Sequence, residues 1–168
     1  KAFKKSSREA NEGAVGVFFN DSKGVLLEVN TETDFAAKND LFLNFLETIS
    51  NYVLQSKNID KIAVEKFMDF EFDGKKIIDH FNDIISKIGE NIVLKRLKLI
   101  NTDLKTKIFT YTHNAYKKNI GKMCVALKIE IDNQNEESLE LGKNLCMHIA
   151  AQKPLSIDID SLDKRLIK

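Results

Sequence analysis

The residues best suited to chemistry lie in one short stretch, Glu28 to Asp40, which reads E-V-N-T-E-T-D-F-A-A-K-N-D. Carboxylates, hydroxyls and amides surround Phe35, an aromatic residue with no obvious core to join. Such groups suit two tasks, which are capping a helix and contacting a partner from an exposed position. In the first interpretation, Thr33 or Asp34 caps a helix and Phe35 folds back as a hydrophobic staple. In the second, Asp34 and Phe35 remain available to another molecule.

An enzyme would need acids and bases that converge on one point. Asp34 could combine with His80, His113 or His148 only by a coincidence of the fold, and no nucleophile motif accompanies them. His80 borders an apolar helical face, and we expect it to be structural. No glycine-rich phosphate loop follows a strand, and no His/Cys pair has zinc-site spacing. We therefore expect no catalytic residue, no metal site, no cofactor and no bound nucleotide.

The composition is typical of a soluble globular protein, with 43% apolar and 30% charged residues in a chain of 168. Lys and Arg number 26 against 25 Asp and Glu, and this balance argues against nucleic acid as the main partner. No apolar run approaches the roughly 18 residues of a membrane span. Cys124 and Cys146 lie in apolar stretches, so we expect two buried thiols in a reducing compartment rather than a disulfide.

The elements before and after the polar stretch define it as a strand-to-helix junction. Residues 14–20 and 24–30 are β-rich runs around a polar turn, which predicts a hairpin. Apolar residues then recur at helical spacing, which predicts a helix from about 39 to 55. Ahead of the hairpin, residues 2–12 predict a short helix that ends at Gly13 in the left-handed conformation.

The next clear element is an isoleucine-rich helix over residues 75–88. The segment before it, 58–74, is ambiguous between a short helix and alternating strands. The helix ends at Gly89, and its pattern demands burial against a sheet or another helix. One face carries Ile77, Ile78, Phe81, Ile84, Ile85 and Ile88.

From residue 91 onward the apolar period changes from helix to strand. A helix follows from about Asn135 to Gln152 and stops before Pro154, because a residue preceding proline disfavours helical geometry. The predicted strands are 91–100, 107–113 and 121–131. Both halves thus run from strands through a polar turn to an amphipathic helix. We expect an α+β fold of two related subdomains, 1–90 and 91–168, each an antiparallel sheet packed with helices.

The polar stretch resembles the signature of elongation factor Ts, the nucleotide exchange factor of translation, which reads much like E-V-N-x-x-T-D-F-V-A-K-N-D. Ala36 stands where the family usually has valine. Three further stretches are similar to family motifs in the same order, so the resemblance covers nearly the whole chain. They are K-I-G-E-N-I at 87–92, the Tyr111-Thr112-His113-Asn114 segment that leads into Ile120-Gly121-Lys122, and M-H-I-A-A-Q-K-P at 147–154.

The resemblance implies that the partner is elongation factor Tu in its GDP form and that the activity is nucleotide exchange without covalent chemistry. In the family, the Asp-Phe pair inserts between helices of the partner near its magnesium site, which here designates Asp34 and Phe35. The other implied contact residues are Thr33, Lys38, Asn39, Ile120, Gly121 and His148. Without the resemblance, Ile120 reads as a surface residue of an edge strand, and His148 reads as a helix-surface histidine.

Two departures from the family pattern qualify these expectations. The N-terminal helical module has no counterpart before Lys1, and the helical hairpin after the second subdomain is missing. The chain therefore resembles the core exchange domain, and we expect a homodimer only with the missing C-terminal segments. We expect no direct contact with nucleic acid or membrane, and a cytoplasmic location or an organellar matrix. The alternative function is a passive protein-binding α+β module without exchange activity.

Overall fold

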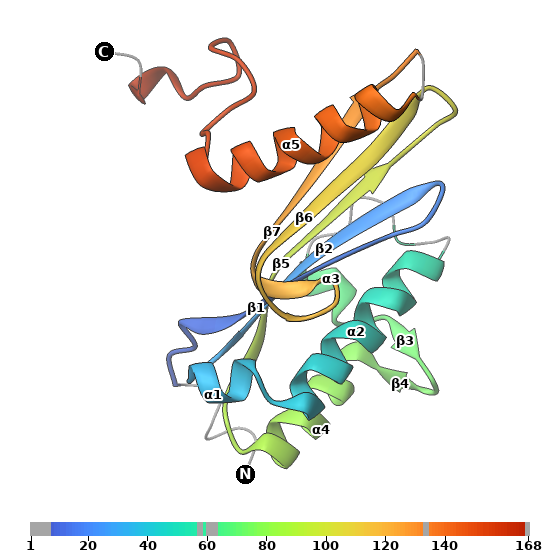
Figure 1. The fold of residues 1–168 in the computed structure, drawn as a ribbon. Coiled ribbons are helices and arrows are strands. Elements are labelled where there is room, and N and C mark those ends of the chain that lie inside the picture. Colours follow the sequence, from blue (N-terminus) through green and yellow to red (C-terminus); the bar gives the residue numbers. More distant parts are fainter. Residues whose placement is uncertain (1–7, 57–58, 60–63, 133–134, 167–168) are drawn as a thin grey trace.

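The computed structural model describes residues 8–56, 59, 64–132 and 135–166. Runs of strands and runs of helices follow one another along the chain, as in an α+β fold (Figure 1). In order they are β1 (Glu12–Phe19), β2 (Lys23–Thr31), α1 (Asp34–Ala37), α2 (Asp40–Gln55), α3 (Val64–Phe67), β3 (Glu71–Phe72), β4 (Lys75–Lys76), α4 (Ile77–Ile88), β5 (Ile92–Asn101), β6 (Thr106–Lys117), β7 (Ile120–Glu130), α5 (Glu136–Gln152) and a final 3-10 turn (Lys164–Leu166).

One antiparallel sheet with strand order β5-β2-β1-β7-β6 runs through both halves of the chain. β5 pairs with β2 along its whole length, although the two strands come from different halves. β1 and β7 are joined by only two residue pairs, Val15–Gly121 and Gly16–Ile120. The α+β class is confirmed, whereas the expected separate sheet for each half is wrong. The division into 1–90 and 91–168 stays a prediction.

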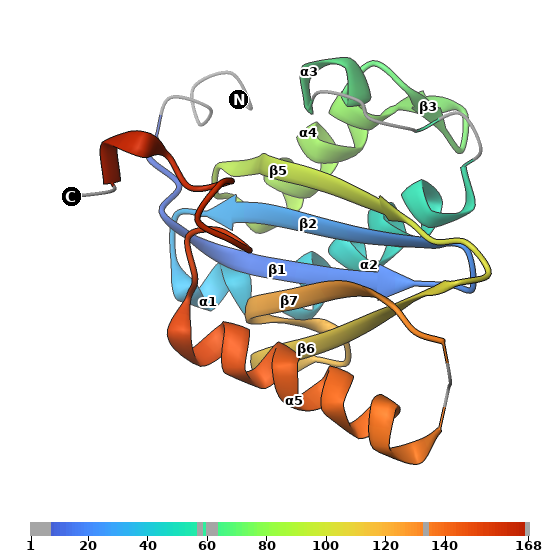
Figure 2. The ribbon, with the colours of Figure 1, turned by 90° about the horizontal axis from the view of Figure 1, so that it is seen from above.

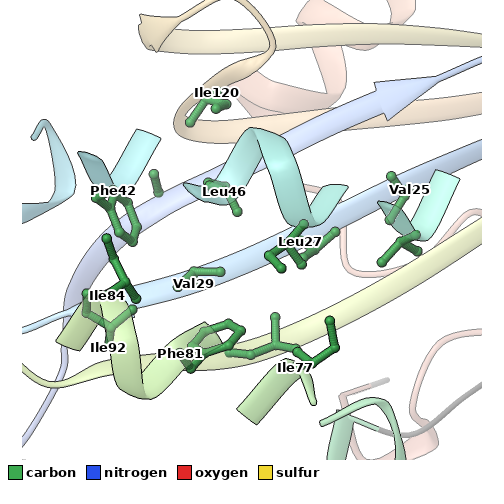
Figure 3. Packing of buried hydrophobic residues seen from close by; sticks show 14 of the residues in the cluster. Val25, Leu27, Val29, Phe42, Leu46, Ile77, Phe81, Ile84, Ile92 and Ile120 are labelled. Carbon is green, nitrogen blue, oxygen red and sulfur yellow. The ribbon is translucent and has the colours of Figure 1, made fainter. Parts of the chain in front are cut away.

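The helices cover opposite sides of this sheet. α2 contacts β1 and β2, and α4 contacts β5, whereas α5 packs mainly on β6 and β7. Both views show α5 on the far side of the strands from α2 and α4 (Figures 1 and 2). The larger hydrophobic cluster accordingly lies between β2, α2 and α4, with members such as Leu27, Phe42 and Phe81 (Figure 3). A smaller cluster beneath α5 consists of Phe109, Val125, Cys146 and Ala150.

The predicted β-hairpin and the long helix after the junction are confirmed by β1, β2 and α2. The predicted N-terminal helix is wrong for the part that the structure describes, because residues 8–11 are not helical and β1 begins at Glu12. The remainder of that helix lies outside the described residues. Gly13 has φ 141° inside β1, and a Cβ there would lie 2.3 Å from the Val29 carbonyl oxygen. This glycine therefore permits close strand pairing and does not end a helix.

α4 is the predicted isoleucine-rich helix, and Gly89 ends it with φ 90°. Ile78 was expected on the buried face, but 38% of its surface is exposed. The residues of α4 that are buried are Ile77, Phe81, Ile84 and Ile85. His80 is structural as predicted, since its Nε2 lies 2.7 Å from the Phe72 carbonyl oxygen. The ambiguous segment before α4 contains both elements, the short helix α3 and the β3–β4 ribbon.

The elements of the second half follow their predicted positions. The three predicted strands correspond to β5, β6 and β7. Asn135 caps α5 by accepting a hydrogen bond from the Ser138 backbone nitrogen at 2.9 Å. α5 ends at Gln152, and Lys153 turns the chain with φ 49° before Pro154. No helix among the described residues is long and apolar enough to cross a membrane.

The two cysteines are both free thiols, as predicted. Cys146 lies on α5 with its side chain fully buried, and Cys124 is half-buried on β7. Burial raises the pKa of the Cys146 thiol to about 11, so few molecules carry the reactive thiolate near neutral pH.

Replacing Ile84 by alanine should lower the free energy of unfolding by roughly 2–5 kcal/mol, because this large side chain is 6% exposed in the core. Ile78→Ala in the same helix is the matched control and should cost less than about 1 kcal/mol. Denaturant unfolding followed by circular dichroism measures both. Equal losses for the two variants would contradict the assigned burial of α4.

A thiol reagent should label both cysteines in the denatured chain without prior reduction. In the folded chain near neutral pH, Cys146 should react more slowly than Cys124, because its thiol is buried and its pKa is raised further. Mass spectrometry of the labelled peptides over time gives both rates. A thiol that reacts only after reductant is added would overturn the assignment of free cysteines.

Candidate partner-binding site

The strand-to-helix junction is built by two successive helix caps. Thr33 stays extended, with φ −124° and ψ 158°, and its hydroxyl accepts a hydrogen bond from the Ala36 nitrogen at 3.2 Å. Asn39 then caps α2 by accepting from the Leu41 nitrogen at 2.9 Å. Each cap satisfies a backbone N–H that a helix start leaves without an internal partner. The predicted capping by Thr33 is confirmed, and both caps fix the course of the chain through the junction.

Phe35 extends from this junction into solvent. Its exposed fraction is 83%, whereas the next two residues, Ala36 and Ala37, are buried. The staple interpretation is wrong, because the Phe35 side chain belongs to neither hydrophobic cluster of the described residues. The buried alanines anchor the turn, so Phe35 is an exposed aromatic residue on an anchored backbone.

Two glutamates tie the junction to the start of β5. The Glu90 carboxylate accepts hydrogen bonds from the Thr33 backbone nitrogen at 3.0 Å and from the Thr33 hydroxyl at 2.7 Å. In the reverse direction, Glu32 accepts from the Asn91 backbone nitrogen at 2.6 Å. No role for Glu90 was predicted from the sequence, although it lies in the K-I-G-E-N-I motif at 87–92. Only the fold brings together groups that are 57 residues apart in the chain.

Asp34 forms an ion pair with Lys38 one turn later, at 2.9 Å between Oδ2 and Nζ. The hydrogen bond from Lys38 holds the pKa of the Asp34 carboxyl below its usual value. The ion pair is therefore kept when the pH falls into the ordinary range of aspartate, and it is lost only at lower pH. The Lys38 ammonium also lies 5.8 Å from the centre of the Tyr116 ring. The junction is thus in contact with the end of β6.

A hollow of about 460 Å³ lies beside this ion pair. Within it, Lys122 contacts the Glu12 carboxylate at 2.5 Å, and this hydrogen bond raises the pKa of Lys122. Charged groups of both signs therefore face the same space. The lining residues are Glu12, Asp34, Lys38, Asn114, Tyr116 and Lys122. The sequence predicted no contact role for Glu12, Tyr116 or Lys122, although Lys122 lies in the Ile120-Gly121-Lys122 motif. Only the fold brings these three residues together, because they lie far apart in the chain.

The tip of the β6–β7 hairpin packs against the first half of the chain. Lys117 donates to Asn44 at 2.7 Å and to Glu47 at 2.5 Å, both on α2. Ile120 has no exposed surface and lies in the large cluster beside α2 (Figure 3). The expectation of an exposed residue on an edge strand is therefore wrong, because the Ile120 side chain lies in the core and β7 lies between β1 and β6. A partner contact at Ile120 stays a prediction.

Gly121 occupies a position where three strands approach closely. It pairs with Val15 of β1 and with Ala115 of β6. A Cβ at Gly121 would lie 2.7 Å from the Thr112 methyl carbon and 2.8 Å from the His113 carbonyl oxygen. Close packing therefore explains a glycine here, and a partner contact at Gly121 stays a prediction.

His148 is exposed on α5, apart from the junction. Its neighbour Met147 lines a second hollow of about 480 Å³ between β6, β7 and α5. The two hollows share Asn114 and Lys122, so they adjoin. Both views also place α1 and the C-terminal end of α5 on the same side of the molecule (Figures 1 and 2). A partner contact at His148 stays a prediction.

The remaining histidines do not assemble an acid–base site with Asp34. His113 Nδ1 lies 3.2 Å from the Tyr111 hydroxyl, and His80 bonds to a carbonyl next to α4. No group of three or more His, Cys, Asp or Glu residues in the described part of the chain could hold a metal ion. The enzyme interpretation therefore gains no support from these contacts.

Comparison with known proteins gives one consistent result. The family model described as Elongation factor TS matches residues 32–168. The chain is 40% identical over 165 residues to elongation factor Ts of Erythrobacter litoralis, covering 98% of this chain and 53% of that protein. It is 38% identical to elongation factor Ts of Paracoccus denitrificans, covering 100% of this chain and 54% of that protein. It is 36% identical to elongation factor Ts of Zymomonas mobilis, covering 99% of this chain and 53% of that protein.

The chain thus spans about half the length of the curated relatives that it matches. The match includes the junction, the hairpin tip and α5, which together surround the two hollows. The chain belongs to the elongation factor Ts family.

Proposed function

We propose that this chain is a guanine nucleotide exchange factor that promotes GDP release from elongation factor Tu. The Asp34–Phe35 turn inserts near the magnesium and nucleotide site of the partner. Membership of a translation factor family supports this role. The observation that carries the proposal is the exposure of Phe35, at 83%, on a turn fixed by two caps and two buried alanines.

Nucleotide exchange of this kind needs differential binding and no covalent chemistry. A factor that binds the opened, nucleotide-releasing state more tightly than the closed GDP state shifts the population toward release. A protruding side chain that fits only the opened partner supplies this difference. The proposal therefore requires no acid–base set in this chain.

Phe35 supplies an apolar surface that a partner can bury. Removing a phenylalanine side chain from water contributes about 2 kcal/mol. Because Thr33 and Asn39 already fix the turn, little conformational entropy is lost when the partner closes around it. A mobile loop with the same sequence would have to be ordered on binding, and the conformational entropy lost would offset part of the free energy gained by burying Phe35.

Asp34 and Lys38 supply exchangeable polar contacts next to Phe35. About half of each side chain is exposed, and exposed ion pairs are weak. Polar groups of the partner can therefore replace Lys38 at the Asp34 carboxylate when the turn inserts. Thr33 and Asn39 hold the turn, and His148 forms a second, separate contact with the partner. The two free thiols fit a reducing compartment, such as the cytoplasm or an organellar matrix.

The direct test is the release of a fluorescent GDP analogue from elongation factor Tu, measured by stopped flow with and without this chain. An exchange factor accelerates release in proportion to its concentration until the complex saturates. A passive binding module forms the complex but leaves the release rate unchanged. That second outcome would refute the proposed function.

Phe35→Ala should lower the catalysed release rate by roughly ten- to a hundredfold, as expected for loss of an aromatic anchor. The free energy of unfolding should change by less than about 0.5 kcal/mol, because the side chain is exposed. Phe19→Ala is the matched control, since Phe19 is 48% exposed at the opposite end of the β1–β2 hairpin. This control should exchange at the rate of the unmodified chain. A fully folded Phe35→Ala variant with an undiminished rate would rule out the role given to the turn.

A further inference from the structure

We infer that Glu90 is a positioning residue for exchange, because it holds the backbone turn that presents Asp34 and Phe35. This inference rests on the proposed function and adds a residue that makes no contact with the partner. It follows from the two hydrogen bonds that the Glu90 carboxylate accepts from Thr33, at 2.7 and 3.0 Å.

Glu90 extends from an anchored part of the backbone. Gly89 closes α4 in the left-handed conformation, and its nitrogen donates to the Ile85 carbonyl at 2.8 Å. On the other side of Glu90, Ile92 starts β5 with 3% of its surface exposed. The glutamate is therefore held between a helix and a strand that both pack on the core. Its carboxylate can act as a fixed acceptor for the junction.

The Thr33 hydroxyl passes this constraint on to α1. It donates to Glu90 and accepts from the Ala36 nitrogen, which uses one donor and one acceptor of the same oxygen. A carboxylate partner fixes the rotation of the hydroxyl and thereby aims its lone pairs at the helix start. Without Glu90, the hydroxyl can turn toward solvent, and the cap on the Phe35 turn is lost for part of the time.

The contacts indicate that Glu90 matters for the turn more than for the fold. Thr33 is exposed and Glu90 is half-buried, so the tie contributes little to global stability compared with the core. The separate bond from the Asn91 nitrogen to Glu32 still holds the end of β2 beside β5 when Glu90 is replaced. Loss of Glu90 should therefore leave the strands in place and loosen the turn beyond them.

Two variants of graded severity test the inference in the GDP-release assay. Glu90→Ala removes both hydrogen bonds to Thr33 and should lower the catalysed rate on the order of tenfold or more, because the loss of even one hydrogen bond to a charged group has about that effect. Glu90→Gln keeps one acceptor oxygen and should give an intermediate rate. Glu65→Gln, at an exposed position on α3, is the control for charge loss and should leave the rate unchanged.

A double-mutant cycle distinguishes positioning from a general structural role. If Glu90 acts through the turn, Glu90→Ala should slow release by less than about twofold once Phe35 is already alanine. Equal fold-losses in both backgrounds would overturn the inference, as would an unchanged rate for Glu90→Ala in the unmodified background.

Amide hydrogen exchange in the isolated chain gives a readout that does not depend on the partner. Protection of the Thr33 and Ala36 amides should fall in Glu90→Ala and remain in Glu65→Gln, while the β2–β5 amides stay protected in both. Unchanged protection of the Thr33 and Ala36 amides would overturn the inference about Glu90 but not the proposed function. If the unmodified chain fails to accelerate GDP release, the proposed function itself is overturned. The role of Glu90 in nucleotide exchange is then overturned as well.

Discussion

The burial of Ile120 fixes the tip of the β6–β7 hairpin against the first half of the chain. Its side chain comes from the second half but lies in the hydrophobic cluster of the first, beside α2. The strand ladder at this point has only two residue pairs, so hydrogen bonding between β1 and β7 is brief. Apolar burial of Ile120 and the bonds from Lys117 to α2 therefore hold the hairpin tip in place.

The packing of the hairpin tip on α2 also determines where the candidate partner-binding site lies. With the hairpin tip fixed against α2, the Tyr116 ring comes close to Lys38, and the hollow beside Asp34 acquires a second wall. The junction itself is fixed from two directions, by its own caps and by the carboxylate of Glu90. Phe35 stays exposed because the two caps and the buried Ala36 and Ala37 fix the backbone that carries it.

Sequence patterns predicted the elements better than their assembly. Alternation and helical spacing located the hairpin, α2, α4 and α5, because repeated positions report which residues share a face. A single apolar residue such as Ile120 has no repeat, so its burial followed only from the hairpin tip packing on α2. A functional role for Phe35 was predicted from its motif, but its exposure could not be derived from a stretch rich in capping groups. The bond from Thr33 to Glu90 required the fold.

The small size of the cluster beneath α5 has a consequence for how the chain unfolds. Among the described residues, the buried apolar side chains there are Phe109, Val125, Cys146 and Ala150, a smaller set than the cluster that packs on α2 and α4. Segments with few buried contacts open locally at lower free energy than the global transition. The Phe35 turn and the helix carrying His148 thus differ in how closely their opening is coupled to global unfolding. The Phe35 turn is expected to melt with the main core, whereas the helix carrying His148 is expected to open and close by itself.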